Sequence, residues 1–501
     1  MAAVSDDFAK KCELKQNETL GRFVVARCDL SAGETLLLEQ SIVVLPHIGD
    51  RRCSKCFKLT ATFCGKCRLL SLCEDCAGHD ERDCQRLREL QLSDEQVQIL
   101  QEKANTEVQP ALACLLLGEH QHSRPLFEEM SQMETHLEAR RGTEIWKRYQ
   151  AHAYAPLEAT GVVKQLHSAS GNAVDEILVQ RLLGILDVNV YEIRAPEQGG
   201  AMRGLYRRAA LFAHSCMPNL ETAIDDERRI KVFANRQIAA GEILYICYTS
   251  VLLGNEERRH ILKTGKCFDC SCARCQDPTE LGTHMSSFIC SGCACSGGYI
   301  VRQLETGTWQ CLLNPEHTLK PEFVSNMLER AKEEIFHARG DIYRLELLLV
   351  KMSRLLHGNH YLMLDLKQNI ASVLRQILQN MAHSPSRKVY ERKIRVCQEL
   401  LLVLKVVAPG ISRLKAIALY ELANTQAELA RKLYSEQEQS SRELLGELNQ
   451  TEIMMREALR MLLFEPVATP EGQMSRSMLR ELKELQNDIK LLQDSNDDIV
   501  N

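Results

Sequence analysis

Eight residues between positions 53 and 84, the finger segment, have the types and spacing of zinc ligands. Three Cys-x-x-Cys pairs precede one histidine and one further cysteine: Cys53, Cys56, Cys64, Cys67, Cys73, Cys76, His79 and Cys84. Eight such ligands fill two tetrahedral sites. We expect an interleaved arrangement, in which the first and third pairs share one ion and the other four ligands share the second. Because protein ligands fill both sites, these ions are predicted to be structural.

The cysteines of the chain are concentrated in two clusters. Of 21 cysteines in 501 residues, seven lie in the finger segment and eight within residues 267–311, whereas the part beyond Lys320 has only Cys397. A secreted disulfide scaffold is normally a short chain with cysteines throughout. Tight clusters in a long chain therefore favour zinc over disulfides. The finger segment is also too short and polar for a hydrophobic core, so metal would supply its folding free energy.

Composition limits the class of protein. A hydrophobic content of 45% predicts ordinary packed cores. The net charge of −5 and the pI of about 6.3 argue against direct binding of nucleic acid. The first sixteen residues contain no apolar stretch, so no signal peptide is expected, and the apolar runs elsewhere are too short to cross a bilayer. We therefore expect a soluble protein inside the cell, with no direct nucleic-acid or membrane partner.

The hydrophobic pattern divides the chain into strand-rich and helical parts. Residues 20–46 and 205–250 have short β-branched and aromatic runs, of which 230–233 and 243–248 are the clearest strands. Between them, residues 87–186 show apolar residues at helical spacing.

Beyond Pro321 the chain is rich in Leu, Glu, Arg, Lys and Gln and has few glycines. Pro409-Gly410 predicts a turn between two helices, and residues 435–441 predict an exposed loop. The pattern favours an all-α bundle. A tetratricopeptide-type array of helix pairs is the alternative, for which the sequence has no clean repeat signature.

Short motifs outside the finger segment follow one another in a fixed order. They are Leu20-Gly21-Arg22-Phe23 with Ser31-Ala32-Gly33-Glu34, then Asn189 with Arg203-Gly204-Leu205-Tyr206 and Ala213-His214-Ser215-Cys216, and finally Gly241-Glu242 and Tyr245-Ile246-Cys247-Tyr248 with Cys267-Phe268-Asp269-Cys270. Taken together and in this order, they resemble the SET- and MYND-domain family, arthropod-type members included. The resemblance covers about residues 17–315.

The resemblance implies an α+β fold. In it, a SET β-fold is split by a MYND-type zinc finger and a helical insert, and a zinc-binding post-SET segment and an all-α C-terminal domain follow. A Gly-x-Gly-x-x-Gly motif between a strand and a helix is absent from the sequence, so a Rossmann-type methyltransferase is not supported. The expected boundaries are 17–52 and 186–255 for the two parts of SET, 53–84 for the finger, 85–185 for the insert, 256–318 for the post-SET region and 319–501 for the helical, TPR-like domain.

The family likeness implies transfer of a methyl group from S-adenosylmethionine to lysine in a histone or another protein. This displacement needs a neutral amine in line with the methyl–sulfur bond, so positioning supplies most of the rate gain. Tyr248 matches the active-site tyrosine of the family; the alternative is a strand aromatic that packs in the core. The resemblance places cofactor contacts at Arg22, Asn189, Ala213, His214, Tyr248 and Phe268.

The resemblance also implies zinc outside the finger segment. Cys216 would join the post-SET cysteines Cys270, Cys272 and Cys275 in a four-thiolate site, the alternative being an unpaired buried cysteine. Another site could use Cys290, Cys293 and Cys311, with either His317 or Cys295 as its fourth ligand. Asn314 stands where the family's last cysteine might fall.

Two departures from the family pattern bear on activity. Ala213 replaces an asparagine of the family, which removes one amide from the cofactor site and costs about 1 kcal/mol of hydrogen bonding. Lys266 replaces a second channel tyrosine. Its charge could repel a substrate ammonium, or its side chain could extend into solvent.

The departures keep a second hypothesis open, a non-catalytic SET/MYND adaptor that binds protein partners and modulates gene expression. Proline-rich peptides that dock on the finger are the partners implied by the resemblance, which permits both nuclear and cytoplasmic locations. A direct transcription factor is disfavoured, because the cysteine spacing is not that of DNA-reading fingers.

Overall fold

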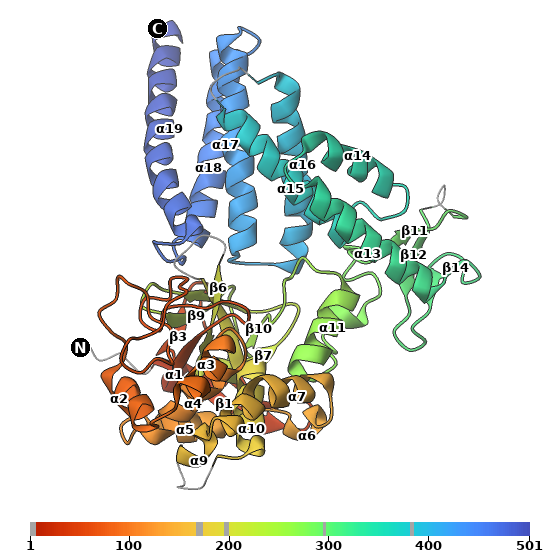
Figure 1. Ribbon diagram of the computed structural model, residues 1–501. Helices are drawn as coiled ribbons and strands as arrows, with labels where there is room; N and C mark the ends of the chain where they lie inside the picture. Colours follow the sequence, from red (N-terminus) through yellow and green to blue (C-terminus); the bar gives the residue numbers. More distant parts are fainter. Residues whose placement is uncertain (1–6, 167–173, 195–199, 294–296, 381–384, 501) are drawn as a thin grey trace.

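Short strands and the helices around them form one lobe, and long helices rise from it as a second region (Figure 1). The computed structural model describes residues 7–166, 174–194, 200–293, 297–380 and 385–500. The strand-rich lobe comes from the N-terminal half of the chain, and the long helices run from α13 (Pro321–Ala338) to α19 (Pro470–Val500). The mixed α+β architecture with an all-helical C-terminal region is as the sequence predicts.

Small sheets build the strand lobe. They pair segments that lie far apart in the sequence, so that the finger and the helical insert interrupt the lobe without breaking it. Within the described residues the pairings are β1 (Cys12–Asn17) with β2 (Gly21–Ala26), β9 (Arg229–Ala234) with β3 (Thr35–Gln40) and β8 (Leu220–Ile224), β6 (Ala201–Leu205) with β4 (Val43–Pro46) and β5 (Val190–Arg194), and, in parallel, β7 (Ala213–His214) with β10 (Tyr245–Ile246).

The core of this lobe comes from the apolar runs that predict strands. Val24, Leu36, Ile230, Val232 and Leu244 are fully buried together, as expected of β-branched and aliphatic residues on inward-facing strand positions.

The expected strand at residues 243–248 is shorter than predicted, because only Tyr245 and Ile246 pair with β7. The N–H of Tyr248 donates to a histidine ring, and the Leu244 N–H to the Val24 carbonyl.

Helices fill the insert, as the periodicity predicts. The apolar faces of α4 (Val108–Glu119) and α10 (Glu176–Asn189) meet in one core, and Asp175 caps α10 by accepting the Leu178 N–H. The other helices from the finger to this point are α2 (Glu81–Glu89), α3 (Asp94–Glu102), α5 (Arg124–Ser131), α6 (Leu137–Arg140), α7 (Glu144–Tyr149), α8 (Ala155–Ala159) and α9 (Val162–Gln165).

Two helices and a small sheet follow the strand lobe. The helices are α11 (Asn255–Lys266) and α12 (Ala273–Gln276). The sheet joins β11 (Phe288–Ile289), β12 (Tyr299–Arg302), β13 (Trp309–Cys311) and β14 (Thr318–Leu319) in sequence order. Phe288 and Trp309 bury their rings edge to face against the first long helices.

In the C-terminal region each long helix packs on the next, as short helix–helix connections favour. The turn expected at Pro409-Gly410 separates α16 from α17. Gly410 has φ +83°, and a Cβ there would lie 2.1 Å from the Asn235 carbonyl oxygen, so only glycine fits. Between α13 and α19 the helices are α14 (Ile342–Met352), α15 (Tyr361–Gln379), α16 (Arg387–Val407), α17 (Arg413–Ser435) and α18 (Ser441–Leu462).

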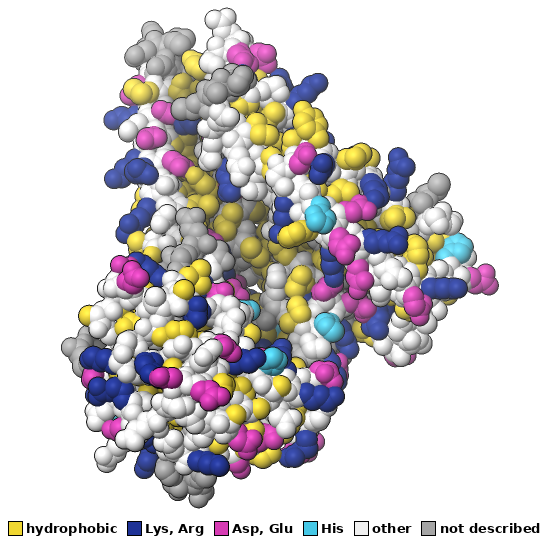
Figure 2. Space-filling view, viewed as in Figure 1, with side chains coloured by type: hydrophobic (Ala, Val, Ile, Leu, Met, Phe, Trp, Pro, Cys, Tyr) yellow, Lys and Arg dark blue, Asp and Glu magenta, His cyan; other side chains and the backbone are white. Residues whose placement is uncertain are grey.

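The helical region is fastened to the strand lobe near the start of α19. Phe464 stacks on Phe233 of β9 with ring centroids 4.2 Å apart, and Arg194 of β5 pairs with Glu471. Figure 2 shows the face between the two regions hollowed, with hydrophobic side chains gathered in the hollow. Within the described residues, no helix is long and apolar enough to cross a membrane.

Candidate functional site

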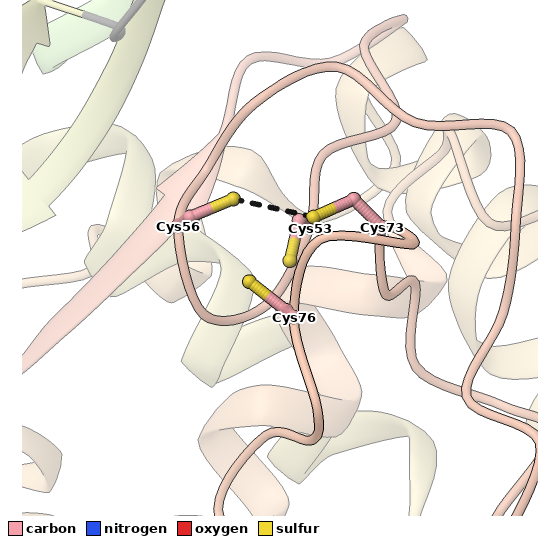
Figure 3. A group of neighbouring side chains, drawn as sticks. All are labelled: Cys53, Cys56, Cys73 and Cys76. Atoms are coloured by element: carbon pink, nitrogen blue, oxygen red, sulfur yellow. Dashed lines mark hydrogen bonds between the residues drawn. The ribbon is translucent and has the colours of Figure 1, made fainter.

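The first and third cysteine pairs of the finger segment converge on one point. Cys53, Cys56, Cys73 and Cys76 come from loops and turn their sulfurs toward one another (Figure 3), with all four sulfurs within 4.8 Å of one another. The Cys56 and Cys73 sulfurs are 3.5 Å apart. Four converging thiols match the donor set of a structural zinc site.

The other four finger ligands form a second group. The Cys64 and Cys84 sulfurs lie 3.8 Å apart, and His79 Nε2 lies 3.3 Å from the Cys67 sulfur. Helix α2 positions Cys84, and Asp80 begins that helix by accepting the Arg82 and Asp83 N–H groups. The two groups have the interleaved membership expected from the spacing.

A third group joins the strand lobe to the post-SET segment. Cys216 follows β7, whereas two of its partners precede α12 and the third, Cys275, lies within that helix; the Cys216 and Cys275 sulfurs are 3.5 Å apart. The four ligand atoms, from Cys216, Cys270, Cys272 and Cys275, lie within 4.8 Å of one another.

A fourth group lies at the small sheet β11–β14. His317 Nδ1 is 3.3 Å from the Cys290 sulfur and 3.2 Å from the Cys293 sulfur, and Cys311 completes the set. A Cβ on Gly292 would lie 2.5 Å from the His317 ring, so the chain bends closely around this group. Of the two candidates for the fourth ligand, His317 lies with the three cysteines. The other candidate, Cys295, lies outside the described residues.

The His214 ring links the third cysteine group to Tyr248. Its Nδ1 accepts the backbone N–H of Tyr248 at 3.0 Å, so Nε2 carries the ring hydrogen and faces the Cys216 sulfur at 3.3 Å. Burial lowers the pKa of His214 to about 4, which keeps the ring neutral at pH 7. One imidazole thus holds both the cysteine group and the backbone at Tyr248.

Tyr248 is half-buried, and its hydroxyl donates to the Phe212 carbonyl at 2.6 Å. Burial raises the pKa of Tyr248 above its usual range, so the phenol stays protonated. The centroid of the Tyr248 ring lies 5.1 Å from that of the His214 ring, and the centroid of the Phe268 ring lies 5.9 Å from that of His214. Three aromatic rings from separate segments are therefore gathered at one place.

The other residues predicted to contact the cofactor differ in how they lie relative to this aromatic group. Ala213 lies beside it on β7, and Asn189 ends α10 with its amide nitrogen donating to the Glu134 and Ile185 carbonyls, each at 2.8 Å. Both hydrogens of this amide are therefore used, and its oxygen is the remaining polar atom of the side chain. Arg22 is exposed on β2, where it donates to the Gln132 carbonyl, and is not part of the aromatic group.

Asn219, between β7 and β8, holds the segment that leads to Tyr248. Its amide nitrogen donates to the Ile243 carbonyl at 2.8 Å, and its amide oxygen accepts the Tyr245 N–H at 2.7 Å. This buried side chain therefore fixes the segment that leads to Tyr248.

Lys266 turns inward, so the expectation that it could extend into solvent is wrong. Its Nζ donates to the carbonyls of Asp187 and Val188, and it lies 5.6 Å from the centroid of the Tyr248 ring. These acceptors belong to the last turn of α10, where helix carbonyls lack intrahelical partners and attract cations.

Comparison with known proteins shows which proteins the chain is similar to. The SET domain model matches residues 21–249, which contain the strand lobe except β1, the finger segment and the insert. The chain thus contains a match to the SET domain and is similar to SmydA-8 and to SMYD methyltransferases. SmydA-8, isoform A, of Drosophila melanogaster is 29% identical over 316 residues, which cover 60% of this chain and 64% of that protein.

Shorter matches relate the chain to proteins named for their activity or domains. Mouse SMYD3, a histone-lysine N-methyltransferase, is 44% identical over 73 residues, which are 15% of this chain and 17% of SMYD3. A SET and MYND domain-containing protein of Dictyostelium discoideum is 32% identical over 100 residues, 18% of this chain and 24% of that protein. The chain thus matches 64% of the length of each SmydA-8 isoform and smaller shares of the others.

Sequence reasoning missed a buried charge network behind the third cysteine group of this SET protein. Arg258 of α11 donates to the Cys216 and Cys275 sulfurs, at 3.2 and 3.6 Å. Glu280 accepts from both Arg258 and Arg274, and all three side chains are at most 1% exposed. A sequence clue exists, because Arg258 stands four residues before the buried Leu262 and so shares the inner face of α11.

Proposed function

We propose that this protein is an S-adenosylmethionine-dependent protein-lysine N-methyltransferase that acts on histone or other protein lysines. The observation that carries the proposal is the convergence of three rings beside the end of α10: His214 and Tyr248 of the matched SET domain, and Phe268, which follows that domain. SET methyltransferases act on lysine-bearing proteins, and their domain implies this cofactor.

The residues at the aromatic group suit the cofactor. Phe268 is half-buried and offers a ring face to an adenine, and Asn189 offers an amide oxygen to polar groups. The backbone of Ala213 and His214 lies at the same place on β7. Bound there, S-adenosylmethionine would supply an electrophilic methyl group.

Tyr248 is the proposed catalytic residue. Its hydroxyl hydrogen is committed to the Phe212 carbonyl and its N–H to His214, so both ends of the residue are fixed before a substrate arrives. The protonated phenol would orient a lysine amine through its oxygen, and the half-buried surroundings favour the neutral amine that the displacement needs. Rate gain would come from positioning, without a covalent intermediate on the protein.

The Tyr248→Phe variant tests this role. We expect methyl transfer from tritiated S-adenosylmethionine to core histones to fall on the order of 100-fold, as for loss of one preorganised polar group at a reacting centre. Tyr434→Phe, at an exposed tyrosine of α17, is the matched control and should keep the wild-type rate. Equal rates in Tyr248→Phe and wild type would remove Tyr248 from the mechanism.

We also propose that all four cysteine–histidine groups hold zinc, two in a MYND-type finger, one in the post-SET segment and one at sheet β11–β14. The convergence of each donor set supports this. We propose the same domain boundaries that the resemblance implies.

The zinc content of the protein distinguishes four occupied zinc sites from three. We expect about four zinc ions per chain by elemental analysis and about three after Cys311→Ser, because that variant removes one ligand of the fourth group. Cys397→Ser changes a buried cysteine of the helical core that belongs to none of the four groups, and should leave four. A wild-type content of three that Cys311→Ser does not lower would contradict a fourth site.

An adaptor role without catalysis is the second candidate. Ala213 and the inward position of Lys266 favour it, because the first lacks an amide and the second places a cation beside Tyr248. In either case we propose a nuclear and cytoplasmic protein whose finger docks proline-rich peptides, and whose effect on gene expression runs through lysine methylation or recruited partners.

A further inference from the structure

Lys266 is held in a site that suits an amine. It ends α11, and the left-handed Cys267 (φ 58°) follows it and turns the chain toward the post-SET cysteines. Its Nζ donates to the Val188 carbonyl at 2.7 Å and to the Asp187 carbonyl at 3.1 Å. We call these two carbonyls, together with the Tyr248 ring, the amine site.

Negative charge near the amine site stabilises the Lys266 ammonium only weakly. The Asp187 carboxylate is already bonded to Arg140 and to the hydroxyl of Tyr149, so its charge is largely compensated within the insert. Burial lowers the pKa of Lys266 to about 8, against the attraction of Asp187. Lys266 is thus held chiefly by the carbonyl bonds and the aromatic face.

The amine site offers the groups that the amine of an incoming substrate lysine would bind. Carbonyl acceptors, an aromatic face and low polarity are grouped beside the phenol proposed to orient the substrate amine. A helix cap alone would need the two carbonyls only, whereas Lys266 also lies over the Tyr248 ring.

We propose that Lys266 occupies the site of the substrate amine from within the chain and competes with a substrate lysine. This inference rests on the proposed methyltransferase function. An arriving lysine must displace the Lys266 side chain, so methyl transfer is slow until that side chain moves. Removing the Lys266 amine leaves a site that takes a primary alkylammonium.

The Lys266→Ala variant tests the competition, with Lys263→Ala as its matched control. Lys263 lies on the same helix, but its side chain is 61% exposed and pairs with Asp269. We expect all three proteins to bind S-adenosylmethionine alike in calorimetry. At low core-histone concentration, Lys266→Ala should transfer methyl groups at least about tenfold faster than wild type, and Lys263→Ala should match wild type.

A probe without cofactor tests the amine site itself. n-Butylammonium has the four carbons and the primary ammonium of a complete lysine side chain, so it should raise the thermal unfolding midpoint of Lys266→Ala relative to the same concentration of sodium chloride. Wild type and Lys263→Ala should show no such rise. With histones present, n-butylammonium should slow Lys266→Ala by raising its KM for histone.

The outcomes are distinguishable. If Lys266→Ala binds the cofactor but transfers methyl groups no faster than wild type, competition by Lys266 is wrong. If none of the three proteins binds the cofactor, the proposed function fails, and stabilisation by n-butylammonium still decides the inference: its absence shows that the site does not take an amine, and its presence shows that it does.

Discussion

Glu280→Gln is expected to lower the free energy of local unfolding around α11 by about 3–5 kcal/mol, the usual cost of breaking a buried ion pair by removing one partner. Glu280 Oε2 accepts from Arg258 at 2.6 Å and from Arg274 at 3.1 Å, and Oε1 accepts from Ser286 at 2.6 Å. Glutamine has nearly the same shape but no charge, so two buried guanidinium groups would lose their counter-ion.

Hydrogen exchange of the α11 amides in zinc-loaded protein measures this loss. Glu334→Gln is the control, because Glu334 pairs with Lys351 at the surface, where both side chains are 41% and 61% exposed. An exposed pair contributes about 0–1 kcal/mol, so the control should exchange nearly as wild type does. If Glu280→Gln exchanged as slowly as the control, the buried network would not stabilise the post-SET segment.

Removal of zinc is expected to unfold the finger segment while the long helices persist. Residues 53–84 contain little regular backbone structure. Helix α2 begins only at the end of this segment, and the rest has isolated β-bridges such as that between Phe63 and Ser71. Structural zinc contributes about 10–16 kcal/mol of apparent binding free energy in zinc-finger peptides, far more than this short segment could obtain from side-chain burial.

Hydrogen exchange after treatment with a tight chelator tests this dependence. Amides of residues 53–84 should lose their protection, whereas those of α17 and α18 should keep theirs, because Ala423, Leu448 and Leu462 bury a core made of side chains alone. Unchanged protection in residues 53–84 after complete zinc removal would mean that the finger folds without metal.

Much of the fold follows from patterns that short stretches of sequence carry. Paired cysteines at fixed spacing predict the two finger groups, since ligand geometry allows few other arrangements. The helical periodicity predicts the insert and the C-terminal region, including the turn at Pro409-Gly410. The resemblance supplied what local patterns lack, namely that Cys216 lies with cysteines more than fifty residues later.

The side-chain contacts of the site depend on tertiary packing, so the sequence predicts fewer of them. The sequence alone does not show that Arg258 donates to thiols or that Asn219 fixes the segment before Tyr248, because each partner lies on another element. Lys266 was marked as a departure, but its direction is set by the unpaired carbonyls at the end of α10, which no spacing reveals. The position of His317 beside Cys290 and Cys293 likewise needs the folded sheet.

Calorimetric titration of S-adenosylmethionine into zinc-loaded protein tests the central claim most directly. We expect saturable binding with a Kd on the order of 1 μM, about −8 kcal/mol, and weaker binding after Phe268→Ala, which removes the ring proposed to face the adenine. No detectable binding by folded, zinc-replete protein would contradict the methyltransferase proposal and favour the adaptor.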